Sequence, residues 1–154
     1  MSKRTTGMIL TAALAVLLLA SCGMISGSRI PAGTYVLETD SGVWTLVLGQ
    51  DTFDYKQESS TGTQLVGYKG TFDGLEGLGL DEYTADLTSL EQWTSGTDYS
   101  EVTLSDQTIE LVYYSDYPLD DVDAKSVSFK LDTNGDGSYS NFSGNVTILG
   151  MNLQ

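Results

Sequence analysis

Hydrophobic and polar residues alternate with a period of two along most of the chain after Gly33. In the sequence TFDYKQE, Phe53 and Tyr55 fall on one face, and Asp54 and Lys56 fall on the other. The same alternation, with occasional slips, recurs in later segments as far as the C-terminus. A period of two is that of a β-strand with one buried face, whereas a helix repeats every 3.6 residues. The pattern therefore predicts half-buried antiparallel strands.

Short stretches rich in Gly, Asp, Asn and Ser separate these strands. They lie at 39–42, 49–51, 59–62, 73–79, 95–98 and 134–137. About eight strands joined by such short turns predict an all-β antiparallel meander that closes into a small barrel, with a two-sheet β-sandwich as the alternative. We favour the barrel because closure removes the exposed edges that an open meander has to protect. We also expect a short helical turn at 87–93.

The first residues have the order of a secretory signal peptide. Lys3 and Arg4 precede an apolar run from Met8 to Ala20, and small residues follow. The run is about a dozen residues long, whereas a helix needs roughly 20 to cross the hydrocarbon core of a bilayer. We therefore expect residues 1–21 to be an export signal rather than a transmembrane anchor.

The sequence LASC at 19–22 resembles the lipobox of bacterial lipoproteins. The resemblance implies cleavage after Ser21, a lipid on Cys22 and attachment to a membrane through that lipid. Cys22 is the only cysteine of the chain, so it has no disulfide partner within it. An ordinary signal peptide with a chance cysteine, or a cysteine buried in the fold, remains the alternative. Gly23 replaces the aspartate that retains some lipoproteins at the inner membrane, which favours the outer membrane in a Gram-negative cell and the cell surface otherwise.

The remaining chain divides into a tether and one domain. Residues 22–32 are small and polar, with one proline and no periodicity, so we expect a lipidated cysteine followed by a spacer. Residues 33–154 form the barrel domain. Without Lys3 and Arg4 the chain keeps 5 basic and all 21 acidic residues, so its net charge changes from −14 to −16. This acidity excludes nucleic acid as a partner, because nucleic-acid binding depends on Lys and Arg.

Four segments resemble the opening half of the small lipocalin-like barrels of bacterial lipoproteins. They are GTYVL at 33–37, WTLVL at 44–48, DTFDY at 51–55 and VGYKGTF at 66–72. The resemblance implies a barrel with a cup for a small apolar ligand. Tyr35 stands where lipocalins proper have a tryptophan.

Six aromatic side chains are predicted to face the inside of the first four strands. They are Tyr35, Trp44, Phe53, Tyr55, Tyr68 and Phe72. In a small barrel such rings either fill the interior, which is the default, or line a cavity for one ligand.

Catalytic motifs are largely absent. The chain has no histidine, and its only cysteine is expected to carry lipid, so Ser-His and Cys-His pairs and His-based zinc sites are excluded. A pair of carboxylates acting in a hydrolase remains possible, because 21 acidic residues offer many accidental pairs. We expect a protein that is not an enzyme.

One polar loop has the spacing of a calcium ligand set. Asp132, Asn134 and Asp136 match the first three ligands of a calcium loop, and Gly137 follows them. The favoured interpretation is a tight turn, because Asn-Gly and Asp-Gly readily adopt positive φ. Weak calcium binding is the alternative, and we expect no other cofactor.

The sequence thus predicts a lipid-anchored envelope protein whose acidic barrel binds a small apolar molecule or a protein partner. The main alternative is a structural or interaction module with a filled barrel, and a carboxylate-dependent hydrolase is a third. A cavity of roughly 300 Å³ or more, lined by the aromatic residues above, would favour ligand binding.

Overall fold

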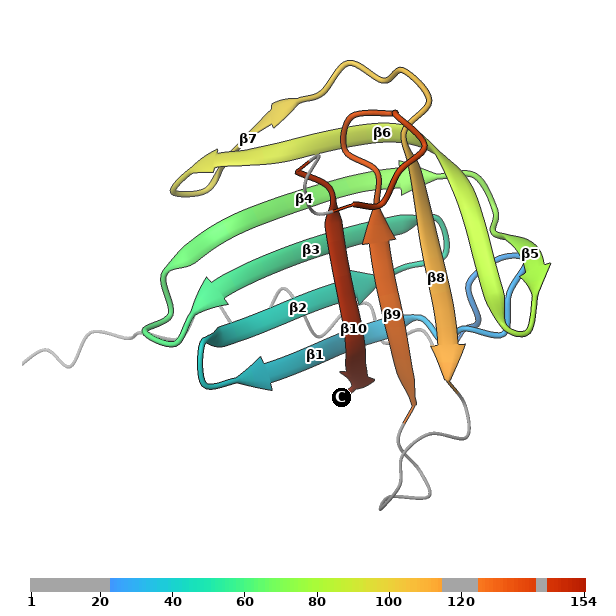
Figure 1. Ribbon diagram of the computed structural model, residues 1–154, viewed down its shortest axis with the longest axis horizontal. Helices are drawn as coiled ribbons and strands as arrows, with labels where there is room; N and C mark the ends of the chain where they lie inside the picture. Colours follow the sequence, from blue (N-terminus) through green and yellow to red (C-terminus); the bar gives the residue numbers. More distant parts are fainter. Residues whose placement is uncertain (1–22, 115–124, 141–143) are drawn as a thin grey trace, which may run out of the picture.

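All regular elements of the described residues are β-strands. The computed structural model describes residues 23–114, 125–140 and 144–154 (Figure 1). The strands are β1 (Gly33–Thr39), β2 (Gly42–Leu48), β3 (Thr52–Ser59), β4 (Gln64–Phe72), β5 (Glu76–Gly79), β6 (Glu82–Ser95), β7 (Asp98–Glu101), β8 (Thr108–Tyr114), β9 (Ser126–Leu131) and β10 (Val146–Leu153).

Eight of these strands close into one antiparallel barrel. Hydrogen-bonded neighbours follow the order β4-β3-β2-β1-β10-β9-β8-β6, and β6 also pairs with β4, which completes the ring. The two short strands β5 and β7 pair with β6 outside the ring. The predicted meander barrel is confirmed, and it has the architecture of a small lipocalin-like barrel. The alternative of two separate sheets is wrong for the described residues, because their strands belong to a single sheet.

The alternation seen in the sequence sorts side chains between the barrel interior and its surface. In β3, Phe53 and Tyr55 are buried while Thr52 and Asp54 are exposed. Both rings contact Phe129 of β9, with centroids 5.7 Å and 5.5 Å apart. Contacts across the barrel between β3 and β9 thus hold its two sides together.

The expected helical turn at 87–93 is wrong, because this segment lies in the middle of β6. Its pairing with β4 shifts register, since Phe72 faces Leu87 whereas the preceding residue of β4 faces Ser89. This β-bulge inserts one extra residue, so Leu87 and Leu90 are both buried although they are three positions apart. Buried residues three positions apart are typical of a helix, which is why the sequence at 87–93 predicted a helical turn.

The expected spacer at 23–32 is also corrected, because the segment folds back on itself and packs against the barrel. Its backbone is closed by a hydrogen bond of 2.9 Å from the Ile25 N–H to the Ile30 carbonyl. Ile25 and Ile30 are almost fully buried, and the Leu75 N–H donates to the Ser26 carbonyl at 3.0 Å. Two isoleucines among small polar residues are enough to anchor the segment in the core.

The strands define two ends of the barrel, which we call proximal and distal. The proximal end contains segment 23–32, the turn at 49–51, the hairpin between β5 and β6, and the C-terminus (Figure 1, with β5 at the right and the C-terminus at the lower centre). The distal end contains the turn between β3 and β4, loop 132–138 and the start of β10. The two ends differ in packing, because the distal half of the barrel contains a cavity, which is described next.

Candidate functional site

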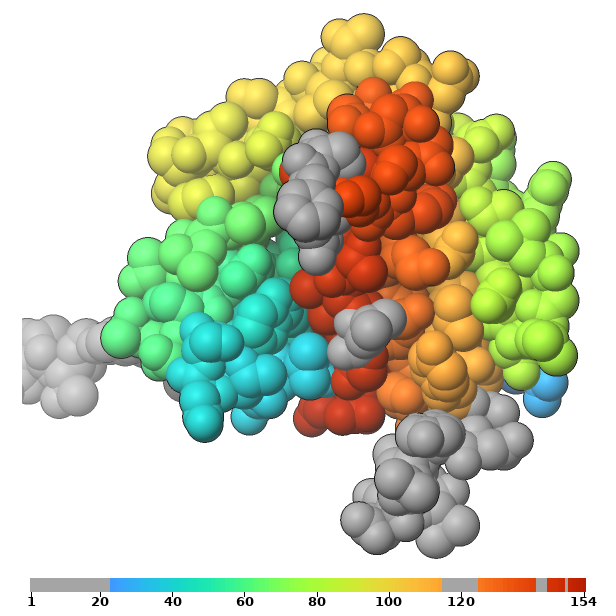
Figure 2. All heavy atoms as spheres, in the orientation of Figure 1, coloured from blue at the N-terminus to red at the C-terminus, as the bar shows by residue number. Residues whose placement is uncertain are grey.

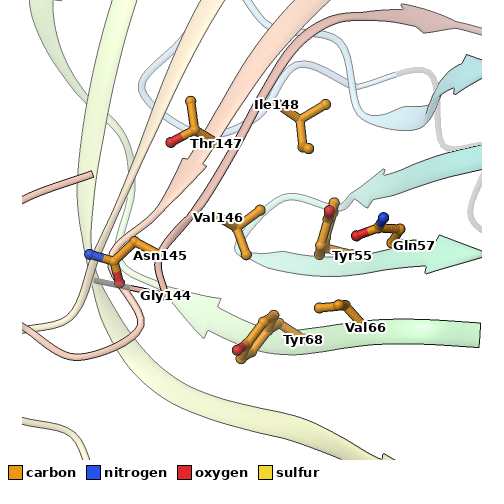
Figure 3. A pocket seen from close by; sticks show the side chains of 9 residues that line it. All are labelled: Tyr55, Gln57, Val66, Tyr68, Gly144, Asn145, Val146, Thr147 and Ile148. Atoms are coloured by element: carbon orange, nitrogen blue, oxygen red, sulfur yellow. The ribbon is translucent and has the colours of Figure 1, made fainter. Parts of the chain in front are cut away.

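A cavity of about 320 Å³ lies in the distal half of the barrel. It is bounded by β3, β4 and the first half of β10. Its lining residues are Tyr55, Gln57, Val66, Tyr68, Gly144, Asn145, Val146, Thr147 and Ile148 (Figure 3). In the close view, Tyr55 and Val66 lie opposite Val146 and Ile148, so apolar side chains of strands from both sides of the barrel face one another.

The cavity exists because β10 separates from β1. These strands pair only at Tyr35 with Leu153 and at Val36 with Asn152, near the proximal end. The first half of β10 stays paired with β9 and has no pairing with β1, and its atoms border those of the first strands on the surface (Figure 2). The separation of β10 from β1 therefore leaves space inside the distal half of the barrel, while the proximal half stays closed.

The six predicted aromatic residues divide between cavity and core. Tyr55 and Tyr68 line the cavity. The other three buried rings, Tyr35, Phe53 and Phe72, are packed in the core. The Tyr35 hydroxyl donates a hydrogen bond of 2.7 Å to the Pro31 carbonyl and thereby ties β1 to segment 23–32.

Trp44 completes the set and is only half-buried. It packs against the core from β2 and pairs across the sheet with Gln57, which is a cavity residue. Trp44 thus lies next to the lining without belonging to it. Aromatic rings thus fill one portion of the interior and line a cavity in the other.

The cavity offers neutral groups to a ligand. Burial raises the pKa of the Tyr55 phenol well above its usual value, and the nearby Tyr68 phenol adds to this effect. Burial also raises the pKa of Tyr68, whose hydroxyl accepts a hydrogen bond of 3.2 Å from Gln92 Nε2. None of the lining residues is an acid or a base apart from these phenols. The arrangement suits an uncharged, largely apolar molecule with a few polar atoms.

Loop 132–138 forms a turn organised by one buried carboxylate. Asp132 is fully buried. Its Oδ1 accepts hydrogen bonds from the N–H groups of Asn134 at 3.3 Å and Gly135 at 2.9 Å, and its Oδ2 accepts one from Gly137 at 2.8 Å. Both glycines have positive φ, as tight turns require.

These contacts support the interpretation of the loop as a turn. The structure brings Asp132, Asn134 and Asp136 together, but the Asn134 amide donates to the Asp136 carboxylate at 3.2 Å, and Asp132 is directed at backbone donors. Within the described ranges no group of three or more His, Cys, Asp or Glu side chains is placed to hold a metal ion. Calcium binding here stays a prediction that the present contacts do not favour.

Sequence reasoning missed Asn145, which joins this loop to the cavity. Its Oδ1 accepts hydrogen bonds of 2.8 Å from both the N–H and the hydroxyl of Thr133. Its Nδ2 donates to the Ser138 carbonyl. Asn145 is buried and lines the cavity, so loop 132–138 supports the cavity rim. No local pattern in the sequence marks this asparagine, because its partners lie across the loop.

A second, smaller hollow bears on the hydrolase alternative. It has a volume of about 160 Å³, and Asp73, Glu76 and Asp86 are among its lining residues. It is separate from the aromatic cavity, whose lining contains no carboxylate. Of these two hollows, only this one offers the carboxylates that such an activity needs.

The predicted lipid site and signal peptide fall outside the described residues, so Cys22 and residues 1–21 stay predictions. None of the residues that the structure covers form a helix long and apolar enough to span a membrane. Comparison of the chain with protein-family models, curated proteins and solved structures found no match.

Proposed function

We propose that this protein is an envelope lipoprotein that holds a small, neutral, largely apolar molecule in the distal cavity. In this proposal the sulfur of Cys22 carries the lipid, and residues 1–21 are removed by cleavage after Ser21. The location is the outer membrane in a Gram-negative cell and the cell surface otherwise. The observation that supports ligand binding is the cavity of about 320 Å³, which lies at the lower end of the usual range for small-molecule sites.

Binding is tested by adding a neutral apolar fluorophore, N-phenyl-1-naphthylamine, to the protein. At about −0.3 kcal/mol per non-hydrogen atom, its roughly 17 atoms give about −5 kcal/mol, or a dissociation constant of about 10⁻⁴ M. Val66→Trp places an indole ring in the cavity and should weaken binding at least about tenfold, which corresponds to about 1.4 kcal/mol. Val47→Trp is the matched control, because Val47 lies on the outer face of β2 between the buried Leu46 and Leu48.

The two variants separate ligand binding from the alternative. Equal fluorescence for the native chain and both variants would show that the probe binds elsewhere, and the filled-barrel module would then be favoured. That alternative draws support from the packed rings of Tyr35, Phe53 and Phe72.

The anchor is tested independently by Cys22→Ser, which removes the sulfur that accepts the lipid. In a bacterial host the native protein should sediment with membranes and carry acyl groups by mass spectrometry. The Cys22→Ser protein should do neither. Membrane association of both forms, without acyl groups on either, would refute the lipid anchor.

A further inference from the structure

Exposed apolar side chains gather at the proximal end of the barrel. In the described residues the exposed large hydrophobic side chains are Met24, Leu65, Leu78, Leu80 and Tyr114. All except Leu65 lie at the proximal end, on segment 23–32, on the β5–β6 hairpin and at the end of β8. Leu65 lies at the opposite end, at a bulge in β4. The distribution is one-sided, as expected for an end that meets an apolar partner.

Leu80 is the most exposed of these residues and occupies an unfavourable backbone position. Its exposed fraction is 97%, and it forms the two-residue turn between β5 and β6 together with Asp81. The φ angles of Leu80 and Asp81 are 51° and 61°. Such turns favour Asn and Gly, since a branched apolar side chain is disfavoured at positive φ. Strained residues of this kind cluster at functional sites.

Hydrogen bonds hold this hairpin against segment 23–32. Arg29 Nη1 lies 3.4 Å from the Asp81 carboxylate, and the Arg29 N–H donates to the Tyr83 hydroxyl at 3.2 Å. The Tyr113 N–H donates to the Asp81 carbonyl at 2.9 Å. Leu80 therefore has a fixed position beside the segment through which the chain enters the barrel.

Segment 23–32 provides no extended spacer between Cys22 and the barrel. It is folded from its first residues, since the Ala32 N–H donates to the Gly23 carbonyl at 2.8 Å. Cys22 directly precedes Gly23, and consecutive Cα atoms are about 3.8 Å apart. A lipid on Cys22 would thus start at the surface of the proximal end.

We propose that the proximal end of the barrel rests on the lipid bilayer, with Leu80 and Leu78 of the β5–β6 hairpin inserted between the lipid headgroups. This inference rests on the proposed lipid on Cys22. The distal cavity then lies away from the membrane, because Val146 of its lining is seven residues along β10 from Leu153, or about 23 Å. The ligand site faces the aqueous phase.

The charged side chains at the proximal end determine which lipid headgroups this end can contact. Asp73, Glu76 and Glu82 are on or beside the hairpin, and Arg29 is paired with Asp81. Lys125, directly before β9, is an exposed cation at this end, but acidic side chains still outnumber basic ones there. Acidic side chains repel anionic headgroups, so apolar insertion rather than charge attraction drives the contact. The contact should be stronger on zwitterionic phosphatidylcholine than on phosphatidylglycerol.

The experiment uses the full-length lipidated protein in phosphatidylcholine vesicles that carry spin labels on their acyl chains. Because Cys22 is the only cysteine and its sulfur is bonded to lipid, Leu80→Cys introduces a single reactive thiol for an environment-sensitive fluorophore. Leu65→Cys is the matched control, because Leu65 is also an exposed leucine, at 50%, but lies at the distal end. Acylation of each protein is verified by mass spectrometry.

We expect the fluorophore at position 80 to shift to shorter emission wavelength and to be quenched several-fold more than the fluorophore at position 65. Equal quenching at both positions in an acylated, vesicle-bound protein would overturn the orientation and leave the lipid anchor intact. A protein without acyl groups that stays in solution would overturn the anchor and this inference together.

Discussion

Replacing Asp132 by Asn tests whether loop 132–138 is organised by a buried carboxylate. The substitution preserves the shape of the side chain and removes its charge. Asp132 accepts hydrogen bonds from three backbone N–H groups while being fully buried. In the variant, an amide NH₂ replaces one of the two carboxylate oxygens of Asp132, so at least one of these backbone N–H groups faces another donor.

The cost follows from the hydrogen bonds that change. Hydrogen bonds to a charged group contribute about 1.5–3 kcal/mol, neutral ones about 0.5–1.5 kcal/mol, and a buried donor left without an acceptor costs about 1–3 kcal/mol. We expect Asp132→Asn to lower the free energy of unfolding by about 2–4 kcal/mol, a large part of the 5–15 kcal/mol that is usual for a domain. Asp136→Asn is the matched control, since Asp136 is exposed, and its cost should stay below about 1 kcal/mol.

Equilibrium urea unfolding of residues 23–154 measures both values, with the slope of the transition as a check that the unfolded surface is unchanged. A cost for Asp132→Asn no larger than that for Asp136→Asn would refute the turn interpretation. The same samples with millimolar calcium or magnesium test the metal alternative. Stabilisation by calcium beyond that by magnesium, lost in Asp132→Asn, would show that the loop binds calcium.

Two further predictions concern the proximal end. Ile30→Ala should lower the free energy of unfolding by about 2–4 kcal/mol, because Ile30 is fully buried. Met24→Ala on the same segment should lower it by less than about 0.5 kcal/mol, because Met24 is exposed. Equal, small costs in urea unfolding would mean that segment 23–32 is a spacer. Leu80→Asn should raise the free energy of unfolding by about 0.5–1 kcal/mol, because Asn tolerates positive φ better than Leu. A lower free energy of unfolding would show that the Leu80 side chain stabilises the barrel itself.

The sequence predicts the barrel because the alternation that sorts side chains is local. Phe53 and Tyr55 face inward for the same reason that Asp54 faces outward, and this reason is visible within three residues. Closure of eight strands then follows from the number of strands and the need to pair their edges. Local alternation and short turns were sufficient to identify the fold class.

The errors arose where one extra residue or one distant contact decides the structure. The bulge opposite Phe72 depends on pairing with β4, so the sequence around Leu87 and Leu90 does not reveal it. Segment 23–32 is polar on average, and only its packing against distant parts of the barrel shows that Ile25 and Ile30 are buried. The cavity likewise depends on where β10 separates from β1, which no local pattern indicates.

The division of the barrel into a packed part and a hollow part constrains how a ligand is exchanged. Phe129 packs against Phe53 and Tyr55, so rings stand between the cavity lining and the proximal core. At the distal end the cavity is lined instead by Asn145, which hydrogen bonds from Thr133 hold against loop 132–138. If the proximal end rests on the bilayer, a lipid would have to leave the membrane and cross about 20 Å of water to reach this end of the cavity. A neutral molecule already dissolved in the aqueous phase, or delivered by a partner at the distal end, reaches it directly and is the better match to the site.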